Sequence, residues 1–283
     1  MQQGYTLPRI AAAHDLSGFG KCALTIALPV LSACGVEVCP LPTAVLSANT
    51  SFQGFTLLDF TPHMEGYIRH WAELGLRFDA FYSGFLGSEH QIHLVRDLIS
   101  RFSPGRIIID PVMADHGKVY KTYTSQMCES MKMLAAIADV VTPNYTEACI
   151  LANEPYQPDQ VSCADISRLA DKIAALGAKS VIITGIERGG ALLNCVLDEQ
   201  GYQERSVPLL PYHMHGTGDL FASVLSGGLV RGHSLYQSVD SAAAFVHFAM
   251  EKSKLYADYN RRGTCFEPYL HLLRTGLFSN NPV

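Results

Sequence analysis

The segment HMHGTGDLFASVLSGGL, residues 213–229, places a carboxylate and a glycine-rich turn at the start of an apolar stretch with helical spacing. Gly216, Thr217 and Gly218 expose consecutive backbone N–H groups there, and the helix dipole favours an anion at that end. Such groups stabilise negative charge on a transferring phosphoryl group. Asp219 can accept the proton of a hydroxyl that attacks a phosphate. A simple helix cap explains the same residues, so the motif alone leaves both interpretations open.

A second glycine-containing turn, HDLSGFGKCALT at residues 14–25, partly resembles a phosphate-binding loop. Gly20 and Lys21 precede a predicted helix. However, Asp15 stands where such a loop needs glycine, and Cys22 stands where it needs the Ser or Thr that holds magnesium. We therefore reject a P-loop. Two interpretations remain: a tight turn between strand and helix, or small residues that let a substrate ring approach the backbone.

Short apolar runs typical of strands alternate with longer segments of helical periodicity. We expect strands at residues 9–14, 36–41, 43–47, 78–84, 106–112, 138–142 and 179–185, followed by a hairpin of 190–198 and 201–210. We expect helices at 20–34, 62–74, 88–102, 124–137, 163–176, 217–230 and 234–256, and one directly after residue 144. This alternation predicts an α/β fold, a three-layer α/β/α sandwich with a central, mostly parallel sheet. Without a linker or repeat, residues 1–283 are expected to form a single domain.

Polar residues follow nearly every predicted strand, where ligands bind in open α/β sheets. They are His14, Asp15, Ser47, Asn49, Thr50, Ser83, Gly84, Asp110, Thr142, Asn144, Thr184 and Gly185. We expect them to converge with the Gly-Thr-Gly-Asp motif on one crevice. Capping also explains Asp110 before Pro111, and a capping box explains Asn144 with Glu147; both roles are compatible with binding.

Composition excludes several other classes of protein. The chain has 283 residues, 48% of them hydrophobic, with 21 Lys and Arg against 26 Asp and Glu, and no basic patch indicates a nucleic-acid partner. Its eight cysteines form no C-x-x-C pair, which indicates reduced thiols and not a disulfide frame or zinc site. We see no secretory leader and no apolar stretch of ~18 residues, so we expect a soluble cytoplasmic protein without a membrane partner.

Three segments carry a resemblance to a known superfamily: DPVMAD (110–115), TPNYTEACIL (142–151) and GTGDLFAS (216–223). In this order and at these separations they resemble the signature segments of the ribokinase-like (PfkB) superfamily of ATP-dependent small-molecule kinases. Within it, TAVLSANTSFQGF (43–55) and YSGFLGS (82–88) are similar to the corresponding segments of pyridoxal kinases. The resemblance covers most of residues 9–250.

The resemblance implies a role for each matching residue. Asp219 would be the base that activates a substrate hydroxymethyl group, beside an anion hole formed by Gly216, Thr217 and Gly218. Asp110 and Glu147 would organise Mg²⁺, Glu147 through metal-bound water. The residues around ATP would be Asp110, Asp115, Tyr120, Thr142, Asn144, Thr184 and Gly185, with Tyr120 on a flap at 116–124. Those around the pyridine ring of the substrate would be Asp15, Ser17, Thr50 and Phe85.

The implied activity is phosphorylation of the 5′-hydroxymethyl group of pyridoxal, pyridoxamine or pyridoxine, which is vitamin B6 salvage to pyridoxal 5′-phosphate. The implied cofactors are ATP and Mg²⁺, a requirement for K⁺ is left open, and the implied assembly is a homodimer. His213 and His215, close to the anion loop, are left open as substrate neighbours.

The first turn departs from the expected pattern. Many pyridoxal kinases carry Ser-His and a YGxxGN-like turn after the first strand, whereas residues 14–23 read HDLSGFGKCA. This start partly resembles the hydroxymethylpyrimidine kinases of thiamine synthesis, which are therefore the alternative. A third hypothesis, of another class, is a non-catalytic sensor that binds a nucleotide or vitamin. Asp219 argues against it, since a pure binding protein has no use for a base there.

Overall fold

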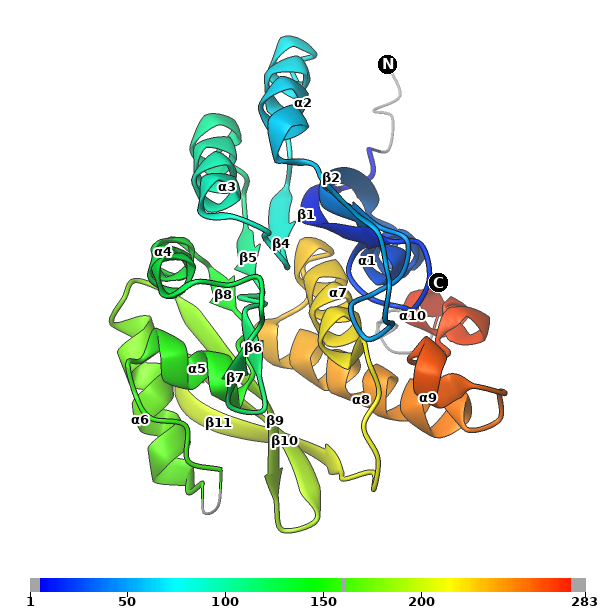
Figure 1. Cartoon of the computed structure of the whole chain (residues 1–283). Coiled ribbons are helices and arrows are strands. Elements are labelled where there is room, and N and C mark those ends of the chain that lie inside the picture. Colours follow the sequence, from blue (N-terminus) through cyan, green and yellow to red (C-terminus); the bar gives the residue numbers. More distant parts are fainter. Residues whose placement is uncertain (1–5, 159–160, 276–283) are drawn as a thin grey trace, which may run out of the picture.

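The computed structural model describes residues 6–158 and 161–275 and contains a nine-stranded central sheet (Figure 1). In spatial order the strands are β11 (Gly201–Pro208), β10 (Ala191–Asp198), β9 (Ser180–Arg188), β8 (Val140–Val141), β5 (Ile107–Ile109), β4 (Ala80–Ser83), β1 (Arg9–Ser17), β2 (Glu37–Leu46) and β3 (Leu57–Asp59). The six strands from β9 to β2 are parallel, and β10, β11 and β3 are added antiparallel at the two edges. The predicted mostly parallel sheet and its terminal hairpin are confirmed.

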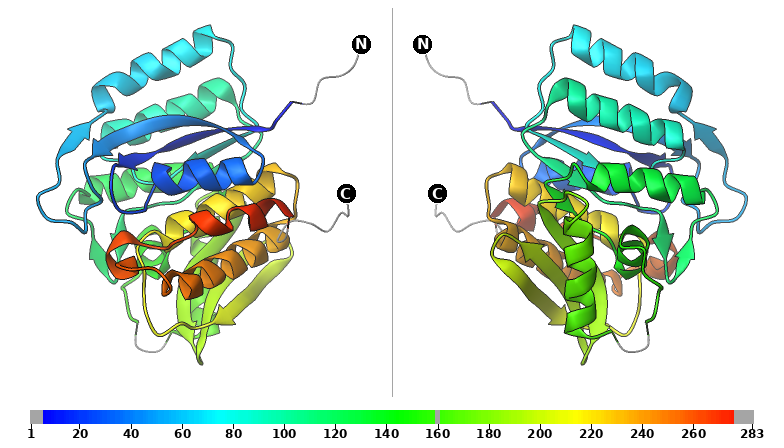
Figure 2. Two further views of the ribbon diagram at one scale, coloured as in Figure 1. Left: turned by 90° about the vertical axis from the view of Figure 1, so that its right-hand side faces the viewer. Right: turned by 90° about the vertical axis from the view of Figure 1, so that its left-hand side faces the viewer.

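Helices cover both faces of the sheet and complete the predicted three layers (Figure 2). One face packs against α1 (Leu24–Ala33), α7 (Thr217–Val230) and α8 (Leu235–Ser253), joined by the C-terminal elements α9 (Tyr259–Arg262), η1 (Glu267–Tyr269) and α10 (His271–Thr275). The other packs against α2 (Thr61–Glu73), α3 (Glu89–Phe102), α4 (Ser125–Ala135), α5 (Tyr145–Leu151) and α6 (Cys163–Ala174). No helix in these described parts of the chain is long and apolar enough to cross a membrane.

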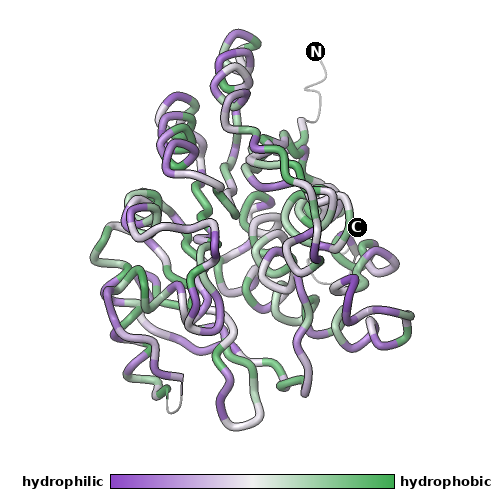
Figure 3. The backbone as a smooth tube through the Cα atoms, viewed as in Figure 1, coloured by the Kyte–Doolittle hydropathy of each residue, from purple (hydrophilic) through white to green (hydrophobic). Residues whose placement is uncertain are grey.

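The central strands are apolar at consecutive positions because both of their faces are covered (Figure 3). Ile108 and Val140 belong to the core on the α7 side, whereas Ile109 and Val141 belong to the opposite core. Successive side chains of a strand alternate between faces. Asp110, two residues after Ile108, therefore continues the face that α7 covers, which brings the strand-end carboxylate under the start of that helix.

Several predicted boundaries were wrong. The two strands predicted at 36–41 and 43–47 form one continuous strand, β2, which pairs with β1 along its length. On its other edge, β3 pairs only with residues 44–46. The edge beside Pro40 and Pro42 is thus open, and no neighbouring strand needs their missing N–H groups. The helix predicted from residue 20 begins at Leu24, because residues 20–23 form a turn.

Some elements were not predicted. The short hairpin of β6 (Ala114–Asp115) and β7 (Lys118–Val119), the edge strand β3 and the elements after α8 carry too few residues to show a period. All eight cysteines are free, as predicted, although Cys163 is exposed.

Close packing of α1 against α7 yields a test with a built-in control. A Cβ added at Gly227 of α7 would lie 2.6 Å from Cys34 Sγ, whereas one at Gly66 of α2 meets only Arg69 Nη2, at 4.0 Å. We expect Gly227→Ala to lower the free energy of unfolding by about 1–3 kcal/mol through overpacking. Gly66→Ala should raise it by about 0.5–1 kcal/mol, the gain in helix propensity. Urea unfolding measures both changes. If the free energy of unfolding changed in the same direction in both variants, the close packing of α7 against Cys34 would be contradicted.

Candidate active site

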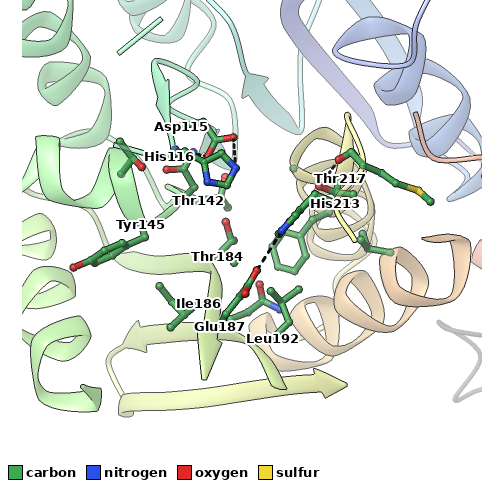
Figure 4. Close-up of a pocket in the computed structure, with 18 of the residues that line it drawn as sticks. Asp115, His116, Thr142, Tyr145, Thr184, Ile186, Glu187, Leu192, His213 and Thr217 are labelled. Carbon is green, nitrogen blue, oxygen red and sulfur yellow. Dashed lines mark hydrogen bonds and ion pairs between the residues drawn. The ribbon is translucent and has the colours of Figure 1, made fainter. Parts of the chain in front are cut away.

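A cavity of about 710 Å³ lies beyond the carboxyl ends of β5, β8 and β9, next to the start of α7 (Figure 4). It brings together most of the residues singled out in the sequence: Asp110, Asp115, Tyr120, Thr142, Asn144, Glu147, Thr184, Gly185, Gly216, Thr217, Gly218 and Asp219. They come from five strands and two helix starts, so the strand ends converge on one site. Their individual roles stay predictions.

Gly216 is the N-cap of α7 and has a φ of 79°, a backbone region that favours glycine. A Cβ there would overlap the carbonyl oxygen of Lys21. No side chain of the described residues caps this helix, and the N–H groups of its first turn lack intrahelical partners. Gly216, Thr217 and Gly218, which the sequence predicted as an anion hole, are the N-cap and the first two residues of this helix, so their N–H groups are among the four unpaired donors of its start; their role stays a prediction.

Asp219 lines the cavity from the first turn of α7 and is partly buried. Burial raises the pKa of its carboxyl group to about 7, and the nearby Asp15 carboxylate adds to the rise. A hydrogen bond from the backbone N–H of Ala23 acts in the opposite direction. A general base works best when its pKa lies near the working pH, so Asp219 is suited to accept a hydroxyl proton near neutrality.

Asp110 and Glu147 form a second acidic group in the same cavity, with only 7% and 3% of their surface exposed. Burial raises the pKa of both well above the usual range. The neighbouring Asp219 raises the pKa of Asp110 further, and Asp110 raises that of Glu147. The three neighbouring carboxylates thus repel one another when they are ionised, and a bound cation would reduce this repulsion.

Glu147 is held firmly by the backbone around it. Its Oε1 accepts a hydrogen bond from the N–H of Met113 at 3.1 Å, and its Oε2 accepts one from the N–H of Asn144 at 2.9 Å. The Asn144 side chain in turn accepts from the N–H of Glu147, which completes the predicted capping box of α5. Asn144 Nδ2 also donates to the carbonyl of Ala114 at 2.8 Å, so the helix start and strand β6 are joined at the cavity.

The chemistry of these side chains is compatible with the predicted Mg²⁺, whose binding stays a prediction. The described residues hold no group of three or more His, Cys, Asp or Glu side chains able to bind a metal alone. Mg²⁺ does not need one, because it is usually held by one or two carboxylates together with phosphates and water. Asp110 offers a carboxylate to the cavity, and Glu147, already engaged by backbone N–H groups, suits a contact through water.

The flap predicted at 116–124 corresponds to the hairpin of β6 and β7 and the residues that follow it. His116 and Gly117 form its turn, with φ values of 47° and 74°, and the N–H of Gly117 donates to Thr146 Oγ1 at 2.9 Å. The ring centres of His116 and His213 lie 6.0 Å apart. His213 Nε2 in turn lies 3.8 Å from Glu187 Oε1 (Figure 4). The flap therefore reaches the loop before α7 at the rim of the cavity.

The four predicted substrate residues, Asp15, Ser17, Thr50 and Phe85, do not line this cavity. Asp15 and Ser17 are buried at the end of β1, where Ser17 Oγ donates to Asp15 Oδ2 at 3.0 Å, and burial raises the pKa of Asp15. Thr50 is exposed in a loop, and the Phe85 ring packs near Tyr123. Asp219 links the cavity to the end of β1, because it lines the cavity and its carboxyl group is also close enough to Asp15 to be affected by that charge.

The apolar wall of the cavity was not predicted. It consists of Leu192, Val207, Leu209, Leu210, Phe221, Ala243, Val246 and Met250, from β10, β11, the loop after it, α7 and α8. An apolar side chain that faces a cavity has the same sequence pattern as one in the core, so no signal in the chain marks this wall. His213 and His215, whose roles the sequence left open, also line the cavity.

Comparison with known proteins identifies the family. The model of the phosphomethylpyrimidine kinase family matches residues 28–261, so the chain belongs to this family, and the ribokinase-like fold is confirmed. A solved structure from Bacteroides thetaiotaomicron, provisionally named a phosphomethylpyrimidine kinase, is 38% identical, with a TM-score of 0.92, over 100% of this chain and 97% of that one. A second crystal form of that protein, with pyridoxal, has a TM-score of 0.90. Pyridoxal kinase from Lactobacillus plantarum is 30% identical, with a TM-score of 0.88, over 95% and 97% of the two chains.

Curated relatives carry the names of both substrates. The chain is 28% identical over 181 residues to the hydroxymethylpyrimidine/phosphomethylpyrimidine kinase of Bacillus subtilis, and 29% identical over 185 residues to the pyridoxine kinase of that species. These matches span 65% and 66% of the relatives' own lengths, and 63% of this chain. Similarity therefore leaves the choice between the two heterocycles open.

The raised pKa of Asp219 predicts a pH-dependent stability. The pKa is about 3.9 in an unfolded chain and about 7 in the folded protein. The unfolded state thus loses its proton first, and stability falls as the pH rises from about 4 to about 7. Asp219→Asn removes this penalty, so we expect its Tm to exceed the wild-type value by a few degrees near pH 8 and by less near pH 5.

Thermal unfolding followed by circular dichroism, without ligand, measures both values. Asp97→Asn on α3 is the matched control, because Asp97 is exposed. It should follow the wild-type pH dependence. A Tm of Asp219→Asn at or below the wild-type value near pH 8 would show that Asp219 carries no burial penalty.

Proposed function

We propose that the chain is a kinase that uses ATP and Mg²⁺ to phosphorylate the 5′-hydroxymethyl group of pyridoxal, pyridoxamine or pyridoxine. The observation that carries this proposal is the position of Asp219, beside the free N–H groups of α7 and within one cavity with Asp110 and Glu147. Family membership supports the kinase reaction. The relative that is 38% identical and was solved with pyridoxal supports the B6 substrate.

In this proposal the side chains divide the work between two halves of the site. Asp219 takes the proton from the substrate hydroxyl as that oxygen attacks the γ-phosphorus of ATP, and ADP leaves. The N–H groups of Thr217 and Gly218 stabilise charge on the transferring group. Asp110 and Glu147 hold Mg²⁺, which neutralises charge on the phosphates when it is bound. The apolar wall between β10 and α8 receives the nucleotide base.

The substrate half lies on the other side of Asp219. Asp15 and Ser17 face it from the end of β1, and we assign to Asp15 the contact with the ring nitrogen or a ring hydroxyl. The alternative is hydroxymethylpyrimidine, which presents the same hydroxymethyl group on a different heterocycle. The match to the phosphomethylpyrimidine kinase family favours it. A homodimer, a single domain, a cytoplasmic location and a need for K⁺ stay open predictions.

Removing the base tests the reaction itself. Asp219→Asn keeps the size of the side chain but cannot accept the hydroxyl proton, and general-base catalysis contributes about 10²–10⁴-fold to rate. We expect kcat with pyridoxal to fall by that factor while the Kd for ATP stays within about threefold of wild type. Steady-state ADP release and a titration with ATP measure the two quantities. Asp97→Asn is again the control, and near-normal turnover of Asp219→Asn would show that another group is the base.

Substrate choice is tested by measuring kcat/KM for the three B6 vitamers and hydroxymethylpyrimidine side by side. We expect the highest value with a B6 vitamer. Asp15→Asn should lower kcat/KM for that substrate by about tenfold, which corresponds to the net contribution of one hydrogen bond. It should leave the KM for ATP unchanged, because Asp15 lies outside the cavity assigned to ATP. A higher kcat/KM for hydroxymethylpyrimidine would establish the alternative.

A further inference from the structure

We infer that Lys21 is a positioning residue, through which the C-terminal segment at residues 261–267 holds the start of α7 and Asp219 in place. This segment lies against the turn after β1 on the α7 side of the sheet (Figure 2). The inference rests on the proposed function in one respect, namely that Asp219 is the base. It adds a role for residues that do not line the cavity.

The C-terminal segment contacts Lys21 at three points. The backbone N–H of Lys21 donates to the carbonyl of Arg262 at 3.1 Å. Its Nζ lies 2.7 Å from Glu267 Oε2, and 5.4 Å from the centre of the Phe266 ring. The Lys21 side chain is only 15% exposed, so this ion pair is better shielded from water than a surface pair. Both backbone and side chain of Lys21 are therefore fixed by the end of the chain.

On its other side Lys21 contacts the start of α7 directly. The carbonyl oxygen of Lys21 approaches Gly216 so closely that a methyl group on this glycine would overlap it. Gly263 is similarly close to the residue before Gly216, since a Cβ at Gly263 would lie 3.0 Å from the carbonyl oxygen of His215. The turn, the loop before α7 and the C-terminal segment thus pack backbone against backbone, and a shift of one displaces the others.

The turn that Lys21 anchors also holds an unusual backbone. Ala23 has φ 48° and ψ −127°, a conformation that residues with a Cβ rarely adopt, and it is 3% exposed. Such a conformation persists only where the surroundings fix it, and it occurs at functional sites. The backbone of Ala23 is close enough to the Asp219 carboxyl group to lower its pKa. The strained residue lies two positions after Lys21 and beside the proposed base, so the contacts that fix Lys21 also restrict this turn.

The family model matches residues 28–261, whereas Lys21 precedes that region and Phe266 and Glu267 follow it. The two partners of the ion pair are 246 positions apart in the chain. The ion pair of Lys21 and Glu267 thus joins a residue before the matched region to one after it.

Three substitutions test the inference by steady-state kinetics. Lys21→Met removes the charge and keeps the length of the side chain. We expect its kcat to fall at least about tenfold, because small misplacements of catalytic groups cost up to about 10²-fold. The KM for ATP should stay within about twofold, and Lys21→Arg should keep most of the wild-type kcat. Lys179→Met is the control, because Lys179 pairs with Asp139 at 2.6 Å just before β9, away from the site. It should leave kcat unchanged.

Hydrogen exchange measures how firmly the contacts of Lys21 hold the turn at residues 20–23, without any activity assay. The amide of Ala23 should exchange at least about tenfold faster in Lys21→Met than in wild type. It should exchange at the wild-type rate in Lys179→Met. If Lys21→Met does not fold, Glu267→Gln removes the same ion pair from its half-exposed end and should show the same changes.

The outcomes separate the two hypotheses. If the wild-type protein turns over and Lys21→Met has unchanged kcat and unchanged exchange, the positioning role of Lys21 is wrong. Faster exchange without wild-type turnover on any tested substrate would support the contact and overturn the proposed function. A loss of kcat matched by an equal loss in Lys179→Met would show that the effect is one of general stability, and would also overturn the positioning role.

Discussion

The crowding of three carboxylates beyond the ends of β5 and β8 is the constraint on which the site depends. Asp219 raises the pKa of Asp110, Asp110 raises that of Glu147, and burial raises the pKa of all three. A folded protein keeps such a group only where other forces hold it, here the backbone N–H groups around Glu147 and the packing of α7. The same unfavourable charge makes the cavity a ready site for a cation and for the transfer of a proton.

The start of α7 is the second half of this arrangement, and glycine makes it possible. At Gly216 the backbone turns with a positive φ and passes within contact distance of the Lys21 carbonyl, which leaves the first-turn N–H groups directed away from any capping side chain among the described residues. A capping Ser or Asp would satisfy those donors internally. Here no side chain of the described residues caps the helix, and in the proposed function these donors bind the transferring phosphoryl group.

The position of Asp219 also explains why one chain can resemble kinases of two heterocycles. In the proposed function, the carboxylates on one side would hold Mg²⁺ with the phosphates of the nucleotide, whichever heterocycle is the acceptor. The end of β1 with Asp15 and Ser17 lies on the other side and is where this chain departs from the pyridoxal kinase pattern. Differences in substrate can therefore accumulate around β1 without disturbing the carboxylates beyond β5 and β8.

The layered α/β fold and the convergence of Asp110, Asn144, Glu147 and Asp219 could be predicted from the residues alone, because apolar periodicity and strand-end position are local properties of a chain. The same holds for the capping box of α5, whose two residues lie three apart. Three features became visible only in the folded chain: Asp15 lies outside the main cavity, an apolar wall from β10, β11 and α8 lines it, and Lys21 pairs with Glu267. These features arise from packing between segments up to 246 residues apart, and such contacts leave no periodic signal in the residues that make them.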